Sequence, residues 1–216
     1  MSRVDAVWAV GRLTIGSLVR LLTPLRNYGA ERVPASGGVV LAVNHFHWID
    51  PPVFGALSPR TIYFLAKAEA HRVAGLGPLM RSFGTISVRR GESDREAVRL
   101  MREVVRDGRA LGLFAEGTRQ QSGVPGRVQP GAAMVAIQED VPIVPAAIYG
   151  SHEWKPGNFR PISVAWGEPM RFEALPRGAK GYREGSVELE RRIHGLHDWL
   201  AEIHALGRPR DATPPR

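Results

Sequence analysis

The alternation of short apolar runs with amphipathic segments is the feature that most restricts how this chain can fold. Six runs are rich in β-branched and aromatic residues and are bounded by glycine or proline, which predicts strands. They cover residues 38–43, 61–66, 84–88, 110–115, 141–148 and 162–166. Helical patterns follow at 93–108, 131–140 and 186–207. This order predicts an α/β fold with a mostly parallel central sheet flanked by helices.

The predicted strands and helices divide the chain into three parts. We expect one α/β domain over residues 31–207, which is long enough to bury a core of its own. Residues 1–30 form a helical segment in front of it, and the proline- and arginine-rich residues 208–216 are predicted to be a disordered tail.

The amino-terminal segment is apolar, but Asp5, Arg12, Arg20 and Arg26 interrupt it. A membrane-spanning helix needs about 20 mostly uncharged residues, so we predict neither a spanning helix nor a secretory signal peptide. An amphipathic helix fits better. Its apolar residues are Val4, Trp8, Leu18, Leu21 and Leu22. Such a helix can dock on a membrane surface or pack on the domain's own core, and both remain open.

The charge balance points to anionic partners. The chain has 29 basic and 21 acidic residues, a formal net charge of +8, and no cysteine. The excess of positive charge favours nucleic acid, an anionic membrane surface or phosphorylated substrates. The absence of cysteine excludes thiol nucleophiles, disulfides and cysteine-ligated metal, and fits an intracellular protein.

Residues 44–50, NHFHWID, place two histidines and an aspartate directly after the first apolar run. Three interpretations are open. His45 and His47 with Asp50 could hold a metal ion. Asp50 could instead fold back on His45 and make its imidazole a general base. Thirdly, Asp50 before Pro51 and Pro52 is typical of a helix cap, with histidines nearby that have structural roles only.

Two more polar clusters follow other predicted strands. Arg89 comes after residues 84–88, and Glu116-Gly117-Thr118-Arg119 follows residues 110–115. The planar guanidinium group of arginine is well suited to phosphate. Because the carboxyl ends of parallel strands meet at one edge of a sheet, these clusters could form a composite site with residues 44–50. The sequence has no phosphate-binding P-loop, no GxGxxG pattern and no GxSxG nucleophile motif.

Four blocks in order resemble the glycerolipid acyltransferase family. They are Asn44-His45-x4-Asp50, FGTISVRRG (83–91), FAEGTRQ (114–120) and VPIVPAAIYG (141–150), within a span from about residue 33 to 166. The chain departs from the family pattern at Gln129-Pro130, where a lysine or arginine often precedes the next helix.

The resemblance implies a role for each block. His45 would be the general base on an acceptor hydroxyl and Asp50 would hold it, with no metal and no cofactor beyond acyl-CoA or acyl-carrier protein as the acyl donor. The family's acceptor phosphate would be held by Arg89, Glu116, Gly117, Thr118 and Arg119. We assign the shaping of the acyl pocket to Asn44, Trp48, Val144 and Pro145. The amino-terminal helix would dock on the membrane.

These implications give one expected function. The chain would move a fatty acyl group to the free hydroxyl of a lysophospholipid, foremost 1-acylglycerol-3-phosphate, as a peripheral or monotopic protein on the cytoplasmic face of the cell membrane. Its partners would be the lipid acceptor, the acyl donor and the anionic membrane surface, with no nucleic acid. The alternatives are another lipid acceptor (lysophospholipid, glycolipid or amino-acid lipid) or a non-catalytic module that binds lipid or phosphate.

Overall fold

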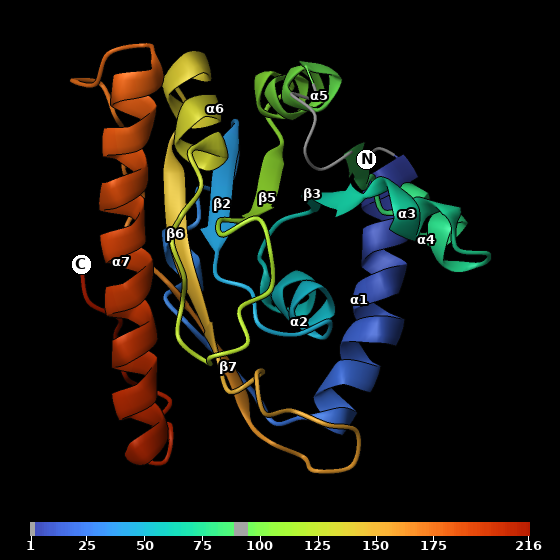
Figure 1. Ribbon diagram of the computed structural model, residues 1–216. Coiled ribbons are helices and arrows are strands. Elements are labelled where there is room, and N and C mark those ends of the chain that lie inside the picture. The colour runs from blue at the N-terminus through green and yellow to red at the C-terminus, as the bar shows by residue number, and fades with distance from the viewer. Residues whose placement is uncertain (1–2, 89–94) are drawn as a thin grey trace.

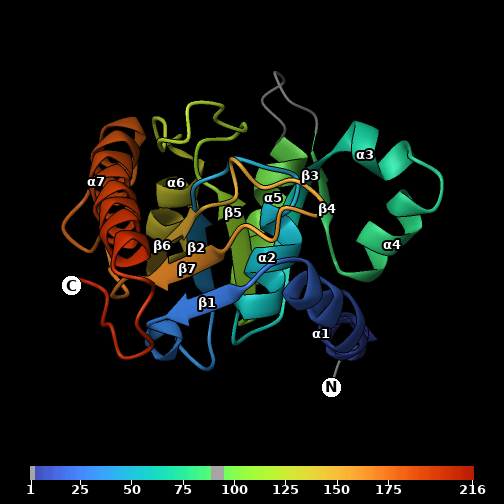
Figure 2. The same cartoon turned by 90° about the horizontal axis from the view of Figure 1, so that it is seen from below.

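The computed structural model describes residues 3–88 and 95–216, which form a sheet with helices on both of its faces (Figures 1 and 2). The strands are β1 (Leu25–Tyr28), β2 (Val39–Val43), β3 (Ile62–Lys67), β4 (Ile86–Val88), β5 (Ala110–Phe114), β6 (Ile143–Tyr149) and β7 (Ile162–Trp166). The helices are α1 (Arg3–Leu22), η1 (Ala30–Arg32), α2 (Asp50–Leu57), α3 (Ala68–Arg72), α4 (Leu76–Ser82), α5 (Arg95–Arg106), α6 (Gly131–Glu139) and α7 (Ala179–Ala205).

The described strands form one seven-stranded sheet in the order β1-β7-β6-β2-β5-β3-β4. All neighbouring pairs are parallel except β6 with β7, so β1 and β7 run against the other five strands. The predicted α/β fold with a mostly parallel sheet is confirmed. The carboxyl ends of β2 and β5 lie side by side, which places the segments that follow them at the same edge.

Side chains of β2 alternate between the two faces of the sheet, as the period of a strand requires. Val39, Leu41 and Val43 join a core with α1 and α2, and Val40 and Ala42 join a core with α5, α6 and α7. Figure 1 shows α6 and α7 on one side of the sheet and α1 on the other. All five residues of β2 are buried, which explains why residues 38–43 read as a continuous apolar run.

Helix α1 has a buried face and an exposed face. Trp8, Gly11, Gly16 and Val19 are buried, and Trp8 donates its indole N–H to the carbonyl of Phe83 at 3.1 Å. The opposite face exposes large apolar side chains, which are Val10, Leu13, Leu18 and Leu21. The predicted amphipathic helix therefore packs on the core through one face and leaves a second apolar face uncovered. No helix in the described part of the chain is long and apolar enough to cross a membrane.

Some elements differ from the sequence predictions. Strand β1 and helices α3 and α4 were not predicted, because four residues of mixed polarity and two short helices carry little periodic signal. The tail also differs from the disorder we expected. Arg32 donates hydrogen bonds to the carbonyls of Pro214, at 2.8 Å, and Pro215, at 2.9 Å, and Ala212 packs beside the core. These contacts hold residues 212–215 against the domain.

Candidate active site

The turn between β2 and α2 is organised by the Asp50 carboxylate. Its Oδ2 accepts hydrogen bonds from His45 Nδ1 at 2.8 Å and from the backbone N–H groups of Phe46 and His47, both at 2.7 Å. Asp50 is fully buried, and its Oδ1 has no hydrogen-bond partner among the described residues. Two amide donors and the imidazole thus hold the carboxylate in one position.

The helix-cap interpretation of Asp50 is wrong in its detail. Asp50 is the first residue of α2, the capping position belongs to Ile49, and no side chain makes a capping hydrogen bond. The carboxylate turns back onto the turn because two amides and an imidazole offer it more donors than the helix end does. Prolines in the first turn of α2 remove backbone N–H groups that would otherwise lack partners.

The His45 imidazole is held on its face as well as at its edge. The ring stacks on Phe114, with centroids 4.0 Å apart and planes 24° apart, and its side chain is 14% exposed. With the Nδ1 proton donated to Asp50, the lone pair on Nε2 is left for a substrate proton. A carboxylate on one ring nitrogen and an available second nitrogen form the arrangement of a general base.

The segment after β5 forms hydrogen bonds with both the N–H and the carbonyl group of His45. His45 N–H donates to Glu116 Oε2 at 2.9 Å, and the Gln120 N–H donates to the His45 carbonyl at 2.7 Å. Glu116 Oε1 accepts a third bond from the Gly126 N–H at 2.7 Å. These hydrogen bonds tie the turn after β2 to the segment after β5.

Glu116 is a buried carboxyl group that titrates near neutrality. Burial raises its pKa to about 7, against the opposing effect of the two backbone donors Gly126 and His45, and the charge of Asp50 raises it further. Both of its oxygens are engaged by backbone amides, and only 4% of the residue is exposed. The assignment of Glu116 as a direct phosphate ligand is corrected here, because its contacts position His45 instead.

Thr118 and Arg119 reach solvent beside the turn. Gly117 has φ 70°, a left-handed conformation that suits glycine, and after it the chain exposes both side chains. Burial lowers the pKa of His47, Asp50 opposes this, and the Arg119 cation lowers it further, so the Arg119 charge acts on the turn. Arg89, the other expected phosphate ligand, lies outside the described residues.

An apolar cavity of about 520 Å³ adjoins the imidazole. Phe114, on which His45 stacks, lines it, and so do Trp48 and Pro51 from the turn and start of α2. The rest of the lining comes from α1, α2, β3, α3 and α4 and the segment that follows α4, including Trp8, Phe64, Ala70, Leu79 and Phe83. The cavity therefore joins an apolar space to the edge of a polar site, as the site of an amphiphilic substrate requires.

Three of the four residues expected to shape this cavity do not line it among the described residues. Val144 and Pro145 lie on β6, on the far side of β2 from β5, and point to opposite faces of the sheet. The Asn44 amide bonds both the N–H and the carbonyl of Ile148, at 2.8 and 3.0 Å, and so extends the pairing of β2 with β6. Trp48 lines the cavity as expected and is 54% exposed.

Most residues that line the cavity were not assigned to it from the sequence, and two of them, Phe114 and Arg12, bear on the chemistry of the site. Phe114 was placed in a strand and at the start of the block 114–120 but was given no role, although it is the last residue of β5 and such a position lies beside the site. Arg12 was expected at the border of the amphipathic helix. It lines the cavity instead, 5.8 Å from the centre of the Trp8 ring, and burial lowers its pKa. Over residues 3–88 and 95–216, no group of three acidic, histidine or cysteine side chains is placed to hold a metal ion.

The chain is similar to several known proteins. The family described as Acyltransferase matches residues 24–149. A 1-acyl-sn-glycerol-3-phosphate acyltransferase of Bacillus subtilis is 29% identical over 185 residues, 82% of this chain and 89% of that protein. A lyso-ornithine lipid O-acyltransferase of Pseudomonas aeruginosa is 34% identical over 68% of this chain and 55% of its own length. The crystal structure of the 1-acyl-sn-glycerophosphate acyltransferase of Thermotoga maritima has the same fold, with a TM-score of 0.69 at 20% identity, over 88% of this chain and 78% of that one.

Proposed function

We propose that this chain, which belongs to the acyltransferase family, moves a fatty acyl group from acyl-CoA or acyl-carrier protein to the free hydroxyl of a lysophospholipid. The acceptor we favour is 1-acylglycerol-3-phosphate, which would give phosphatidic acid. One observation carries the proposal: the His45 imidazole is fixed between Asp50 and Phe114 at the edge of the apolar cavity. The name of the Bacillus subtilis relative supports the choice of acceptor.

In the proposed reaction His45 Nε2 takes the proton of the acceptor hydroxyl while the hydroxyl oxygen attacks the carbonyl carbon of the thioester. The new C–O ester bond forms, the C–S bond breaks, and the thiolate leaves with the proton that the imidazolium returns. Asp50 holds the ring by Nδ1 throughout. The acyl chain lies in the apolar cavity, where burying each CH₂ group is worth about 0.8 kcal/mol. The reaction needs the acyl donor and no further cofactor.

Arg119 and Thr118 are the described residues that we propose for the acceptor phosphate, together with Arg89. Support comes from their exposure beside the turn and from the effect of the Arg119 charge on His47. A guanidinium group can donate two parallel hydrogen bonds to phosphate. Gly117 provides the conformation that presents both side chains.

We place the protein at the cytoplasmic face of the cell membrane as a peripheral protein, and the exposed face of α1 supports its contact with a lipid surface. Leu13 and Leu21 are 75% and 72% exposed, and Val10 and Leu18 lie on the same helix. Such apolar side chains on an amphipathic helix gain free energy by entering the lipid interface. The lysophospholipid acceptor would then reach the cavity from the membrane that α1 contacts, and an anionic membrane surface would attract the net charge of +8.

A second acceptor is favoured by one specific comparison. The Pseudomonas aeruginosa relative that matches at 34% identity is named for a lyso-ornithine lipid, which is an amino-acid lipid. Residues Gln129 and Pro130 also lack the cation that often stands there in the family. Transfer to lyso-ornithine lipid is therefore the alternative to 1-acylglycerol-3-phosphate.

An acyl-transfer assay tests both the reaction and the acceptor. The protein is mixed with palmitoyl-CoA or palmitoyl-carrier protein and with 1-acylglycerol-3-phosphate, lysophosphatidylcholine or lyso-ornithine lipid. Thiol release and the acylated product are then measured together. We expect acceptor-dependent thiol release, fastest with 1-acylglycerol-3-phosphate. Thiol release that does not depend on any acceptor would indicate a thioesterase, and no release with any pair would refute the proposal.

A further inference from the structure

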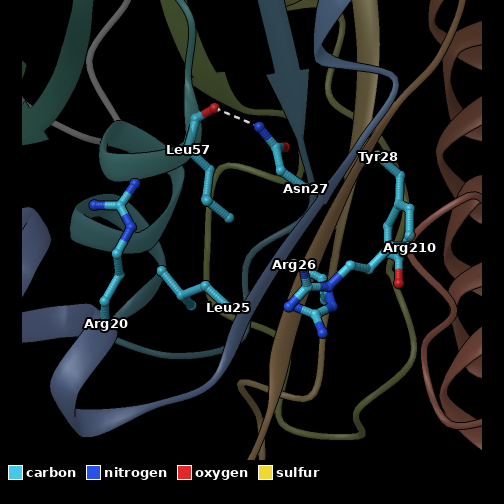
Figure 3. A pocket seen from close by; sticks show the side chains of 7 residues that line it. All are labelled: Arg20, Leu25, Arg26, Asn27, Tyr28, Leu57 and Arg210. Carbon is cyan, nitrogen blue, oxygen red and sulfur yellow. Dashed lines mark hydrogen bonds between the residues drawn. The ribbon is translucent and has the colours of Figure 1, made fainter.

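A second cavity, of about 540 Å³, lies at the outer edge of β1 and is lined mainly by polar side chains (Figure 3). Arginines reach it from three parts of the chain: Arg20 from the last turn of α1, Arg26 from β1, and Arg210 from the carboxyl-terminal tail. Its other lining residues are Leu25, Asn27, Tyr28 and Leu57. Figure 3 shows Arg26, Arg210 and Tyr28 on one side of Leu25 and Arg20 on the other.

Donor groups of this cavity lack partners among the described residues. Arg26 Nε and Tyr28 Oη are buried and make no hydrogen bond there. Buried donors without a partner are rare in proteins and call for an explanation. Asn27 and Arg20, in contrast, donate to the carbonyls of Leu57 at 2.8 Å and Ala56 at 3.1 Å, which fixes the wall next to α2.

The positive charges around this cavity are not balanced by any carboxylate of residues 3–88 and 95–216. Burial lowers the pKa of Arg208, and the nearby Arg26 cation lowers it further. Arg208 is therefore a fourth arginine that adds to the positive electrostatic potential around the cavity. Within the described part of the chain, none of Arg20, Arg26, Arg208 and Arg210 forms an ion pair. By contrast, Glu139 pairs with Arg102 and Arg106, and Glu188 pairs with Arg191 and Arg192. The charges of these four arginines are therefore partly balanced by the two glutamates.

We propose that the cavity lined by Arg20, Arg26, Tyr28 and Arg210 is a binding site for a phosphate group, separate from the site at His45. Phosphate supplies several acceptor oxygens and a negative charge, which match guanidinium forks and a phenolic O–H. A phosphate there would accept from the guanidinium groups of Arg26 and Arg210, which line the cavity. Among the described residues, this cavity and the one beside His45 share no lining residue.

A phosphate at this site can come from a membrane lipid or from a soluble ester. The position of Arg20 favours the lipid, since its neighbours Leu18 and Leu21 belong to the exposed apolar face of α1. A lipid phosphate bound here would hold the end of α1 at an anionic membrane. The soluble source shares the same chemistry, and the experiment below separates the two.

The test compares Arg26→Gln/Arg210→Gln with a charge-matched control, Arg177→Gln/Arg183→Gln, whose arginines are exposed and line neither of these cavities. Both are made in an Arg119→Gln background, which weakens the proposed acceptor site. One arm measures the rise in Tm with inorganic phosphate against chloride at equal ionic strength. The other measures partitioning onto phosphatidylcholine vesicles with and without phosphatidic acid. Arg26→Lys/Arg210→Lys keeps the charge but removes the guanidinium fork.

We expect Arg26→Gln/Arg210→Gln to partition roughly 10-fold more weakly onto vesicles that contain phosphatidic acid, while the control changes by less than 2-fold. The lysine variant should fall between them. A loss of the phosphate-dependent Tm rise with unchanged vesicle partitioning would assign the site to soluble phosphate esters. Equal behaviour of the glutamine variant and the control in both arms would overturn the proposal, and neither arm depends on turnover.

Discussion

Helices α1 and α2 line two cavities of similar volume and opposite chemistry. The cavity beside His45 is lined by apolar side chains with Arg12 as its one cation among the described residues, whereas the cavity on β1 contains three arginines. An imidazole with a fixed carboxylate stands beside the first cavity only, because Phe114 lines that cavity and stacks on His45. The second has donors and positive charge and no general base.

The difference follows from which part of α1 faces each space. On the inner face of the helix, five residues line the apolar cavity: Trp8, Gly11, Arg12, Ile15 and Gly16. Arg20, in the last turn, lines the other cavity. Burying a long apolar chain and binding a phosphate need surroundings of opposite polarity, so one cavity could not serve both. Variants that act on one cavity and spare the other test this division of roles.

The largest expected effect is that of His45→Ala. Removing the base should reduce acyl transfer by roughly 10²-fold or more, since general-base catalysis contributes about that much. Circular dichroism and partitioning onto phosphatidic acid vesicles should stay at the wild-type level, because the arginine cavity is untouched. The control is His194→Ala, on α7, whose side chain contacts the Gly126 carbonyl at 3.5 Å. Turnover within 3-fold of the wild type would remove His45 from the mechanism.

The position of His45 could be predicted from the sequence better than its surroundings could. The spacing of His45 and Asp50 at a strand end made their contact one of three open interpretations, because a turn of that length can return the carboxylate to the ring. The resemblance to the family favoured it, and the structure shows the contact. Six of the seven strands followed from apolar runs, and β1 did not because an edge strand of four residues has no such run. A strand that is buried on both faces is marked in the sequence by a continuous apolar run.

The apolar cavity could not be predicted, because it depends on the packing of helices far apart in sequence. Its walls come from α1, α2, α3, α4 and the ends of β3 and β5, so no single motif marks it. The error at Val144 and Pro145 has the same origin. Strand β6, which contains both residues, pairs with β2 on the side away from β5. Only the order of the strands in the sheet reveals this.

A second prediction concerns Glu116, which contacts the backbone of His45, and the way it makes the stability of the protein depend on pH. Burial raises its pKa from the ordinary 4.5 to about 7, so the folded state binds this proton more tightly than the unfolded state. Its contribution to stability is therefore present below pH 4.5 and is lost as pH rises through 7. Glu116→Gln has no such group, and its amide NH₂ would face a backbone donor at His45 or Gly126.

Denaturant unfolding of both proteins between pH 4.5 and 7.5 measures this effect. The stability advantage of the wild type over Glu116→Gln should shrink by up to about 3 kcal/mol across that interval, at about 1.4 kcal/mol per pKa unit. A constant difference would show that Glu116 ionises in the folded protein as it does in the unfolded one.

A third prediction tests the apolar cavity as the acyl site. Ala70, on α3, lines it, and an indole at this position would occupy space that the end of a long acyl chain needs. Ala70→Trp should reduce kcat/KM for palmitoyl donors about 10-fold, which corresponds to displacing about two CH₂ groups. Octanoyl donors should change by less than 3-fold. The matched control is Ala174→Trp, at an exposed position. Equal losses for both chain lengths would place the acyl chain elsewhere.

The smallest expected effect separates apolar docking by α1 from phosphate binding at the β1 cavity. Leu13→Ser/Leu21→Ser removes two exposed apolar side chains, and Val187→Ser/Leu206→Ser, at sites 67% and 74% exposed, is the control. We expect about 5-fold weaker partitioning of the α1 variant onto vesicles with or without phosphatidic acid, since insertion of leucine into the interface does not need lipid charge. Turnover of a soluble short-chain acceptor should be unchanged, because both leucines lie outside the cavities.

Arg26→Gln/Arg210→Gln should weaken binding only where phosphatidic acid is present. If the leucine variant lost binding only on anionic vesicles, or matched its control on both, then the exposed face of α1 would not be the membrane contact.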